Sequence, residues 1–216
     1  MDSETTMSTQ SVSHEAVSRI RDAKVFSRIG MWLFILSEIL IFGGLFLLYA
    51  MYRAKHPADF HAGSLELSRF DGTLNTIILL TSSLTAALAV FSTQELGKRI
   101  QTAWYLRATI ACGLAFLVVK TFEWGAKFEH GLYPRAAVLD ARPHGEILYF
   151  GLYFTMTGLH ALHVIIGMGV LSFVLRWVSQ NKITQQRFAI LENGVLYWHL
   201  VDVIWIFLFP LFYLIS

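Results

Sequence analysis

The sequence carries little charge and almost no cysteine. Aspartate, glutamate, lysine and arginine make up only 15% of its 216 residues, whereas an average soluble domain carries about 25%. The formal net charge of +2 comes without a basic stripe, so nothing suggests that the chain binds nucleic acid. The single cysteine, Cys112, excludes an intramolecular disulfide and a metal cluster built from several thiolates.

The chain also lacks a secretory signal, internal repeats and low-complexity tracts. Residues 1–25 are polar and contain no apolar core of the kind that a signal peptide requires. We predict a partly disordered N-terminal tail over 1–25, followed by a single domain over 26–216.

Long apolar runs take the place of charge. Hydrophobic residues make up 55% of the chain, and its mean hydropathy is +0.54. A membrane-spanning helix needs about 20 predominantly apolar residues, and five segments meet that need: 29–52, 73–93, 103–124, 147–177 and 194–215. The sequence therefore predicts an all-α fold, a polytopic membrane bundle of five transmembrane helices.

Cationic residues predict the orientation, because they are enriched in cytoplasmic loops. Ten of them lie on the side of the N-terminus, and six lie on the other. The ten are Arg19, Arg21, Lys24, Arg28, Lys98, Arg99, Arg107, Arg176, Lys182 and Arg187; the six are Arg53, Lys55, Arg69, Lys127, Arg135 and Arg142. The imbalance predicts that the N-terminus is inside and the C-terminus outside.

Several ionisable residues interrupt the apolar runs. A charge at the centre of a spanning helix costs about 2.5–3.5 kcal/mol on insertion scales, so such residues face the bundle, a cavity or a partner. The candidates for a buried polar, proton-related or structural role are Glu38, Glu123, His160, His163, His199 and Asp202.

Their spacing predicts local pairs, because residues three or four apart share a helix face. His160 and His163 share one face, and His199 and Asp202 share another, which makes Asp202 a candidate partner of His199. On a third helix, Lys120, Glu123 and Lys127 form a row that partly neutralises itself. Gly167 continues the face of His163, where a small residue allows close helix approach.

Three interpretations of these residues compete. They hydrogen-bond across helices and fix the packing; they form a proton or ion path with Glu38; or they hold haem or two irons. The Glu-x-x-His pairs of di-iron bundles are absent, as is an HExxH motif. Trp198 and Trp205 form a stripe that favours packing over a cofactor site. Glu38 itself fits a structural hydrogen bond, a proton relay or a regulator of a nearby proton path.

Taken in order, five blocks resemble a known family. "GMWLFILSEILIFGGLF", "LNTIILLTSSLTAAL", "KTFEWGAKFEHG", "YFTMTGLHALHVIIG" and "ENGVLYWHLVDVIWIFLFPLFYL" are similar to blocks of subunit III of the haem–copper cytochrome c oxidases. The resemblance covers about residues 26–215. It implies the five-helix bacterial short form, in a chain that begins at the segment matching the third helix of the seven-helix long form.

The resemblance also implies a role. It implies a non-redox, non-catalytic subunit that packs against subunit I, supports proton uptake and protects the enzyme from turnover inactivation. No cofactor is expected in this chain, and the haems and copper lie in subunits I and II. Further expected partners are subunit IV, a respiratory supercomplex and bound phospholipid, in a bacterial inner membrane.

Matching positions in the family carry structural polar residues. Glu38 matches the buried glutamate of the "SEI" segment, and Glu123 matches that of the third-span motif of this chain. The remaining candidates match the "HGLH"-like and "WH-VD" positions. Other open alternatives are subunit III of a quinol oxidase, a homologue associated with nitric oxide reductase, a proton-coupled transporter and a stand-alone haem or di-iron enzyme.

Overall fold

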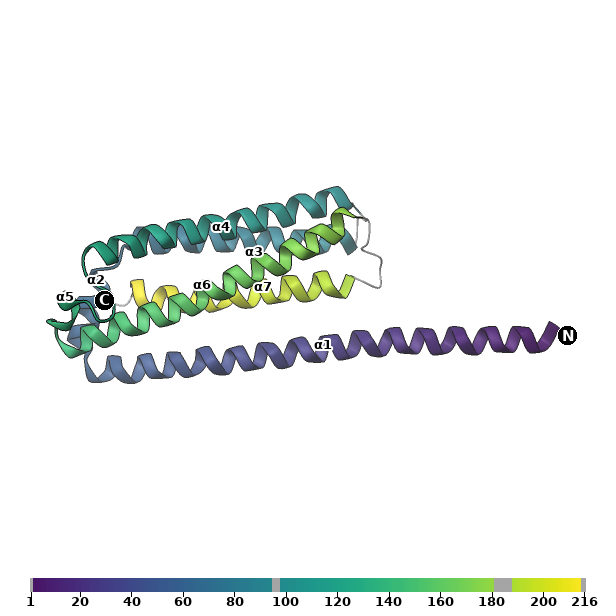
Figure 1. Ribbon diagram of the computed structural model, residues 1–216, viewed down its shortest axis with the longest axis horizontal. Coiled ribbons are helices and arrows are strands. Elements are labelled where there is room, and N and C mark those ends of the chain that lie inside the picture. Colours follow the sequence, from purple (N-terminus) through teal and green to yellow (C-terminus); the bar gives the residue numbers. More distant parts are fainter. Residues whose placement is uncertain (1, 95–97, 181–187, 215–216) are drawn as a thin grey trace.

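A bundle of long helices makes up the protein, as the computed structural model in Figure 1 shows. The structure describes the backbone of residues 2–94, 98–180 and 188–214, and the side chains of these residues from Val25 onward. Its long helices are α1 (Asp2–Lys55), α3 (Arg69–Gln94), α4 (Arg99–Glu129), α6 (His144–Ser179) and α7 (Phe188–Phe209). Short helices α2 (Pro57–Leu65) and α5 (Ala137–Asp140) and a π-helical segment, η1 (Pro210–Leu214), complete the described fold.

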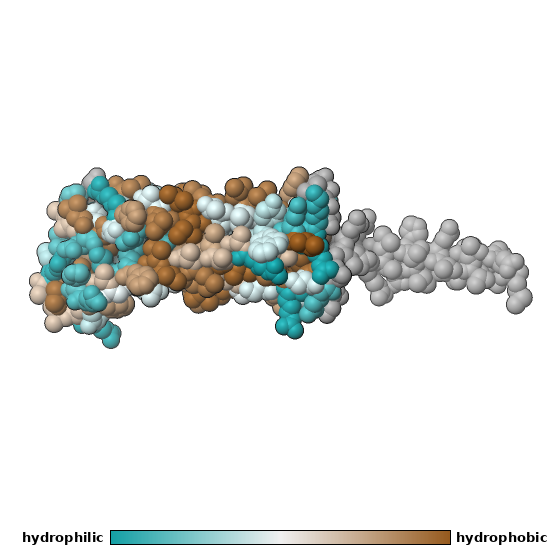
Figure 2. Space-filling view, turned by 90° about the horizontal axis from the view of Figure 1, so that it is seen from above, coloured by the Kyte–Doolittle hydropathy of each residue, from teal (hydrophilic) through white to brown (hydrophobic). Residues whose placement is uncertain are grey.

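The five predicted spans are confirmed. Each coincides with a helix that is long and apolar enough to cross a membrane, and these helices extend the predicted bounds by a few residues at most ends. Residue 215, where the fifth predicted span ends, lies outside the described residues. Figure 2 shows the result on one face, where an apolar band separates two polar ends. Large apolar side chains such as Leu47 and Phe122, exposed by 74% and 76%, are what a lipid- or protein-facing surface requires.

Helix α1 begins before the apolar run does. Its backbone is helical from Asp2, whereas the sequence predicts a partly disordered tail over residues 1–25. No proline or glycine occurs before Gly30, so nothing in this segment breaks a helix that the first span propagates. In Figure 1 this part of α1 extends beyond the bundle.

Neighbouring helices form two pairs with α1 at the side. Helices α3 and α4 pack on each other, α6 packs on α4 and α7, and α7 also packs on α3. Helix α1 contacts α6 and α7. The C-terminal ends of α3 and α6 lie at the end of the bundle from which the N-terminal part of α1 extends (Figure 1). Helices α2 and α5 and the segment η1 lie at the opposite end.

Polar residues hold the end of the bundle that carries α2 and α5. The Asp59 carboxylate of α2 accepts a hydrogen bond from the backbone N–H of Gly145, at 3.2 Å, in the first turn of α6. Arg142 donates to Glu146 at 2.9 Å and to Glu66 at 3.2 Å. The hydrogen bond with Glu146 raises the pKa of the Arg142 guanidinium above its usual value, so this cation stays charged at every physiological pH.

Trp198 is the residue around which four helices meet. Its side chain is wholly buried, and its indole N–H donates to the Ser82 hydroxyl of α3 at 3.0 Å. A Cβ added to Gly113 of α4 would lie 2.8 Å from the indole, and one added to Gly167 of α6 would lie 2.9 Å from it. The prediction that Gly167 allows close helix approach is confirmed, and the tryptophan of α7 occupies the space that the two glycines leave.

Replacing Gly167 with alanine is expected to destabilise the protein, because the added methyl group would lie 2.9 Å from the indole of Trp198. Overpacking of this kind costs about 1–3 kcal/mol. Gly169 is the matched control, since a Cβ there meets nothing within 4 Å and alanine gains up to about 1 kcal/mol over glycine in a helix. Thermal unfolding in detergent measures both variants. A loss of stability in Gly169→Ala equal to that in Gly167→Ala would contradict this explanation.

Candidate functional site: buried polar clusters between the helices

Glu38 lies against His163. Glu38 on α1 and His163 on α6 are both 8% exposed, and Oε2 of the glutamate lies 3.0 Å from Nε2 of the imidazole. The other ring nitrogen, Nδ1, lies 2.8 Å from the Leu159 carbonyl oxygen. Phe42 meets the His163 ring edge-on, with ring centroids 5.5 Å apart. The carboxyl group is therefore satisfied within the chain, by a residue 125 positions away.

This geometry limits the protons that the pair can hold. A carbonyl oxygen only accepts, so Nδ1 of His163 carries a hydrogen and donates it to Leu159. One further proton then sits between Nε2 and the carboxyl group of Glu38. The pair is either imidazolium with carboxylate or imidazole with carboxylic acid, and both states are neutral overall. A neutral pair is the form in which a buried glutamate is least costly.

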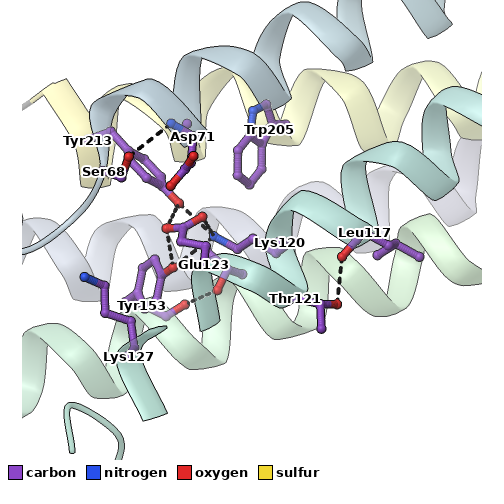
Figure 3. A network of polar contacts seen from close by, with 12 residues as sticks. Ser68, Asp71, Leu117, Lys120, Thr121, Glu123, Lys127, Tyr153, Trp205 and Tyr213 are labelled. Atoms are coloured by element: carbon purple, nitrogen blue, oxygen red, sulfur yellow. Dashed lines mark hydrogen bonds and ion pairs between the residues drawn. The ribbon is translucent and has the colours of Figure 1, made fainter. Parts of the chain in front are cut away.

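The second cluster is closed on itself and lies deep in the bundle (Figure 3). Lys120 of α4 is 2% exposed and Glu123 is 4% exposed. The Lys120 ammonium donates to Glu123 at 3.1 Å, to the Tyr153 hydroxyl at 3.0 Å and to the Tyr213 hydroxyl at 2.7 Å. Both hydroxyls donate to Oε1 of Glu123, at 2.7 Å and 2.6 Å.

All three ammonium hydrogens have partners in this cluster, so the buried charge is compensated as its position requires. The Trp205 ring adds a cation–π contact, with Nζ of Lys120 5.4 Å from its centroid. The predicted pair of Lys120 with Glu123 is confirmed. Lys127, the third member of the predicted row, instead donates to the backbone carbonyl of Glu66. The two tyrosines were not predicted, because nothing in their apolar blocks marks them as partners of a lysine on another helix.

Tyrosine hydroxyls also hold the C-terminal segment η1. Tyr49 of α1 donates to the Leu211 carbonyl at 2.6 Å, and Tyr149 of α6 donates to the Phe212 carbonyl at 2.9 Å. Carbonyls at the end of a helix lack partners within it. Pro210 has no N–H to donate to the preceding turn, which accounts for the change to π-helix there. The end of the last span is thus tied to α1, α4 and α6.

The third cluster joins α7 to α3. The predicted neighbours His199 and Asp202 lie together, but Nδ1 and Oδ2 are 4.0 Å apart, which is too long for a hydrogen bond. The hydrogen-bond partner of His199 Nδ1 is the Ser83 hydroxyl, at 2.8 Å, and Asp202 is a further neighbour on the same helix face. Helix periodicity identifies neighbours on one helix only, and Ser83 is on another.

His160 has different surroundings from His163, although the two share one side of α6. His160 is fully buried, and its ring lies among aromatic rings, with centroids 5.4 Å from Phe116 and 5.2 Å from Trp205. Neither ring nitrogen has a hydrogen-bond partner among the described residues. Trp198 and Trp205 serve packing, as predicted, and the Trp205 indole N–H donates to Thr76 at 3.0 Å.

Within 25–94, 98–180 and 188–214, no group of three or more His, Cys, Asp or Glu side chains is placed to hold a metal ion. Glu38 is hydrogen-bonded to His163, and Lys120 is hydrogen-bonded to Glu123. These side chains therefore satisfy one another within two separate clusters. What these clusters can do chemically is hold protons and lock helices together.

Comparison with known proteins assigns the family. The sequence profile of the family described as "Cytochrome c oxidase subunit III" matches residues 9–216. The chain belongs to the cytochrome c oxidase subunit III family. This is a family of haem–copper oxidase subunits, and the resemblance drawn from the five sequence blocks is confirmed.

Three relatives of this chain carry names of oxidase subunits. The cytochrome c oxidase subunit 3 of Thermostichus vulcanus is 31% identical over 202 residues, which make up 93% of each chain. That of Pelomedusa subrufa is 35% identical over 190 residues, covering 84% of this chain and 67% of the relative. A "Heme-copper oxidase subunit I+III" from Aeropyrum pernix is 32% identical over 195 residues, covering 87% of this chain and 22% of the relative.

Proposed function

We propose that this chain is the non-redox subunit III of a proton-pumping respiratory haem–copper oxidase that passes electrons from cytochrome c to oxygen. The observation that carries the proposal is the family match over residues 9–216, which includes all five spans. In this proposal the chain packs directly against subunit I in a bacterial inner membrane, and the redox centres belong to subunits I and II.

Two observations support the association with subunit I. The relative from A. pernix carries a name that joins subunits I and III, and fusion into one chain suits two parts that work in contact. The exposed apolar side chains of the five spans also offer ample surface for another membrane protein.

The proton-related part of the proposal rests on Glu38 and His163. Their single shared proton sits between two helices, and α1 contributes one of the two groups. Moving the proton within the pair leaves the net charge of this buried site at zero. We assign to it a role in supporting proton uptake and in prolonging the catalytic life of subunit I.

Glu38→Gln separates the proton role from packing. The amide of glutamine can still donate to Nε2 of His163, so the contact between α1 and α6 survives while the titratable proton is lost. Initial oxygen consumption by the assembled oxidase is expected to stay close to wild type, and the number of turnovers before inactivation is expected to fall. Glu38→Leu is the matched control, because it removes both the titratable proton and the hydrogen-bond partner of His163. The unpaired imidazole is expected to lower the free energy of unfolding by about 1–3 kcal/mol.

These results are read from the oxygen-consumption trace of the purified complex. Unchanged catalytic life in Glu38→Gln would contradict the proton role. Loss of initial activity in a fully assembled Glu38→Gln complex with intact haems would contradict the non-catalytic assignment.

The electron donor has its own test. Purified complex is expected to oxidise reduced cytochrome c with consumption of oxygen. Oxidation of quinol without oxidation of cytochrome c would place the chain in a quinol oxidase instead.

A further inference from the structure

One polar cluster reaches the surface of the bundle at the depth of the membrane centre. His199 and Ser83 both lie in the middle third of their spans, Phe188–Leu214 and Arg69–Gln94. The His199 side chain is 34% exposed, compared with 3% for Lys120 and 10% for His163. It is therefore the ionisable side chain that stands out at this depth, in a region where water is absent.

The exposed nitrogen of His199 has no partner within the described residues. Nδ1 lies within hydrogen-bond distance of the Ser83 hydroxyl, so Nε2 is the ring nitrogen that is left for a partner outside the chain. Asp202, three residues further along α7, is 3% exposed, and its Oδ2 lies 4.0 Å from Nδ1 of His199. The half-exposed imidazole of His199 is thus the polar group at this place for which a membrane interior demands a partner.

Exposed hydroxyls elsewhere on the spans behave differently. Thr81 and Thr121 are also exposed, but each donates to a carbonyl of its own helix, at 2.8 Å. Lipid can cover such a hydroxyl at little cost. It cannot satisfy the Nε2 of His199, so the structure leaves a specific need at this one face.

The surroundings suit a close-packed helix. Val203 and Ile206 follow His199 along α7 and are 48% and 46% exposed. On α3, Leu80 and Leu84 flank Ser83 and are 50% and 61% exposed. Ala87 follows Ser83 by four residues, and small residues at this spacing let another helix approach closely.

We infer that this α3/α7 face, centred on His199 and Ser83, is where a transmembrane helix of subunit I packs. That helix brings a hydrogen-bonding side chain to Nε2 of His199 near the membrane centre. The inference rests on the proposed function, since it takes subunit I as the partner, and it adds the face and the chemistry of the contact.

Photo-crosslinking in the assembled oxidase tests the face. A benzophenone amino acid replaces Val203, one turn from His199, in one sample and Leu114 of α4 in the other. Leu114 is 53% exposed, and each position follows the first residue of its helix, Arg99 or Phe188, by the same interval. Helices α4 and α7 run in the same direction (Figure 1), so the two probes lie at similar depth.

A covalent product with subunit I is expected from position 203 and not from position 114. A product from position 114 alone, a product with lipid alone at position 203, or one with a second copy of this chain would overturn the inference. If subunit I is absent from the purified complex, the proposed function fails as well, and that outcome is visible before any irradiation.

His199 variants test the hydrogen bond. His199→Leu is expected to raise the fraction of this chain that detergent strips from subunit I by about 3- to 18-fold, the range for one interhelical hydrogen bond in a membrane. His199→Gln is expected to restore most of the retention, because its amide can still donate and accept. Thr81→Val is the matched control and should leave retention unchanged. Equal retention in His199→Leu and wild type would contradict the contact.

Discussion

Lys120→Met is expected to lower the free energy of unfolding by about 3–5 kcal/mol, because it leaves the buried Glu123 carboxylate without its cation. Lys120 is 2% exposed, and water cannot replace the ammonium group at that depth. Tyr153 and Tyr213 still donate to the carboxylate, but they do not neutralise it. Chemical unfolding of the full chain in detergent measures the loss.

The double variant Lys120→Met with Glu123→Gln is the control for charge. It removes both ions, and the glutamine oxygen can still accept from the tyrosine hydroxyls. Its loss of stability is expected to be smaller than that of Lys120→Met alone, since an uncompensated charge costs more than a missing pair. A loss in the double variant as large as that in Lys120→Met alone would show that the cluster acts through packing and not through charge compensation.

Trp198→Ala is expected to cost about 3–5 kcal/mol, as large aromatic deletions in a packed core do. The indole lies against both Gly113 and Gly167, so its removal leaves a cavity where α4, α6 and α7 meet. Trp198→Phe should cost less, because a ring remains although the hydrogen bond to Ser82 is lost.

Trp32 supplies the comparison for Trp198. Its side chain is 59% exposed on α1, and Trp32→Ala should change stability by no more than about 0.5 kcal/mol. Thermal unfolding of the isolated full chain separates the two cases. Equal losses in Trp32→Ala and Trp198→Ala would contradict the central position of Trp198.

The sequence predicts much of the fold because the membrane imposes a simple rule. A span must be long, apolar and helical, and this rule identifies all five helices from composition and length. The same rule singles out Glu38, Glu123 and Asp202, since a carboxylate without a partner is costly in the hydrocarbon core of a membrane.

The sequence does not predict which helices face each other. Helical periodicity pairs Lys120 with Glu123 on one helix, and the structure confirms that pair. The contacts of Glu38 with His163 and of Ser83 with His199 join residues 125 and 116 positions apart. Such contacts depend on how the helices pack, and no local pattern encodes that.

Glycine gives a partial signal for this packing. Gly167 indicates close approach on the face of α6 that continues from His163, and the structure bears this out. It does not indicate that the approaching residue is Trp198, nor that Gly113 of α4 lies against the same indole. The roles of Tyr153 and Tyr213 cannot be predicted from the sequence either, because tyrosine is a common residue in apolar spans.

The most direct test of the central claim is affinity purification of the full chain from its native membrane, with identification of the co-purified subunits and a redox difference spectrum. The expected result is a complex that contains subunits I and II and shows haem absorbance, while the chain separated from it shows none. A chain that purifies without a haem-containing partner, or that carries stoichiometric haem by itself, would contradict the assignment.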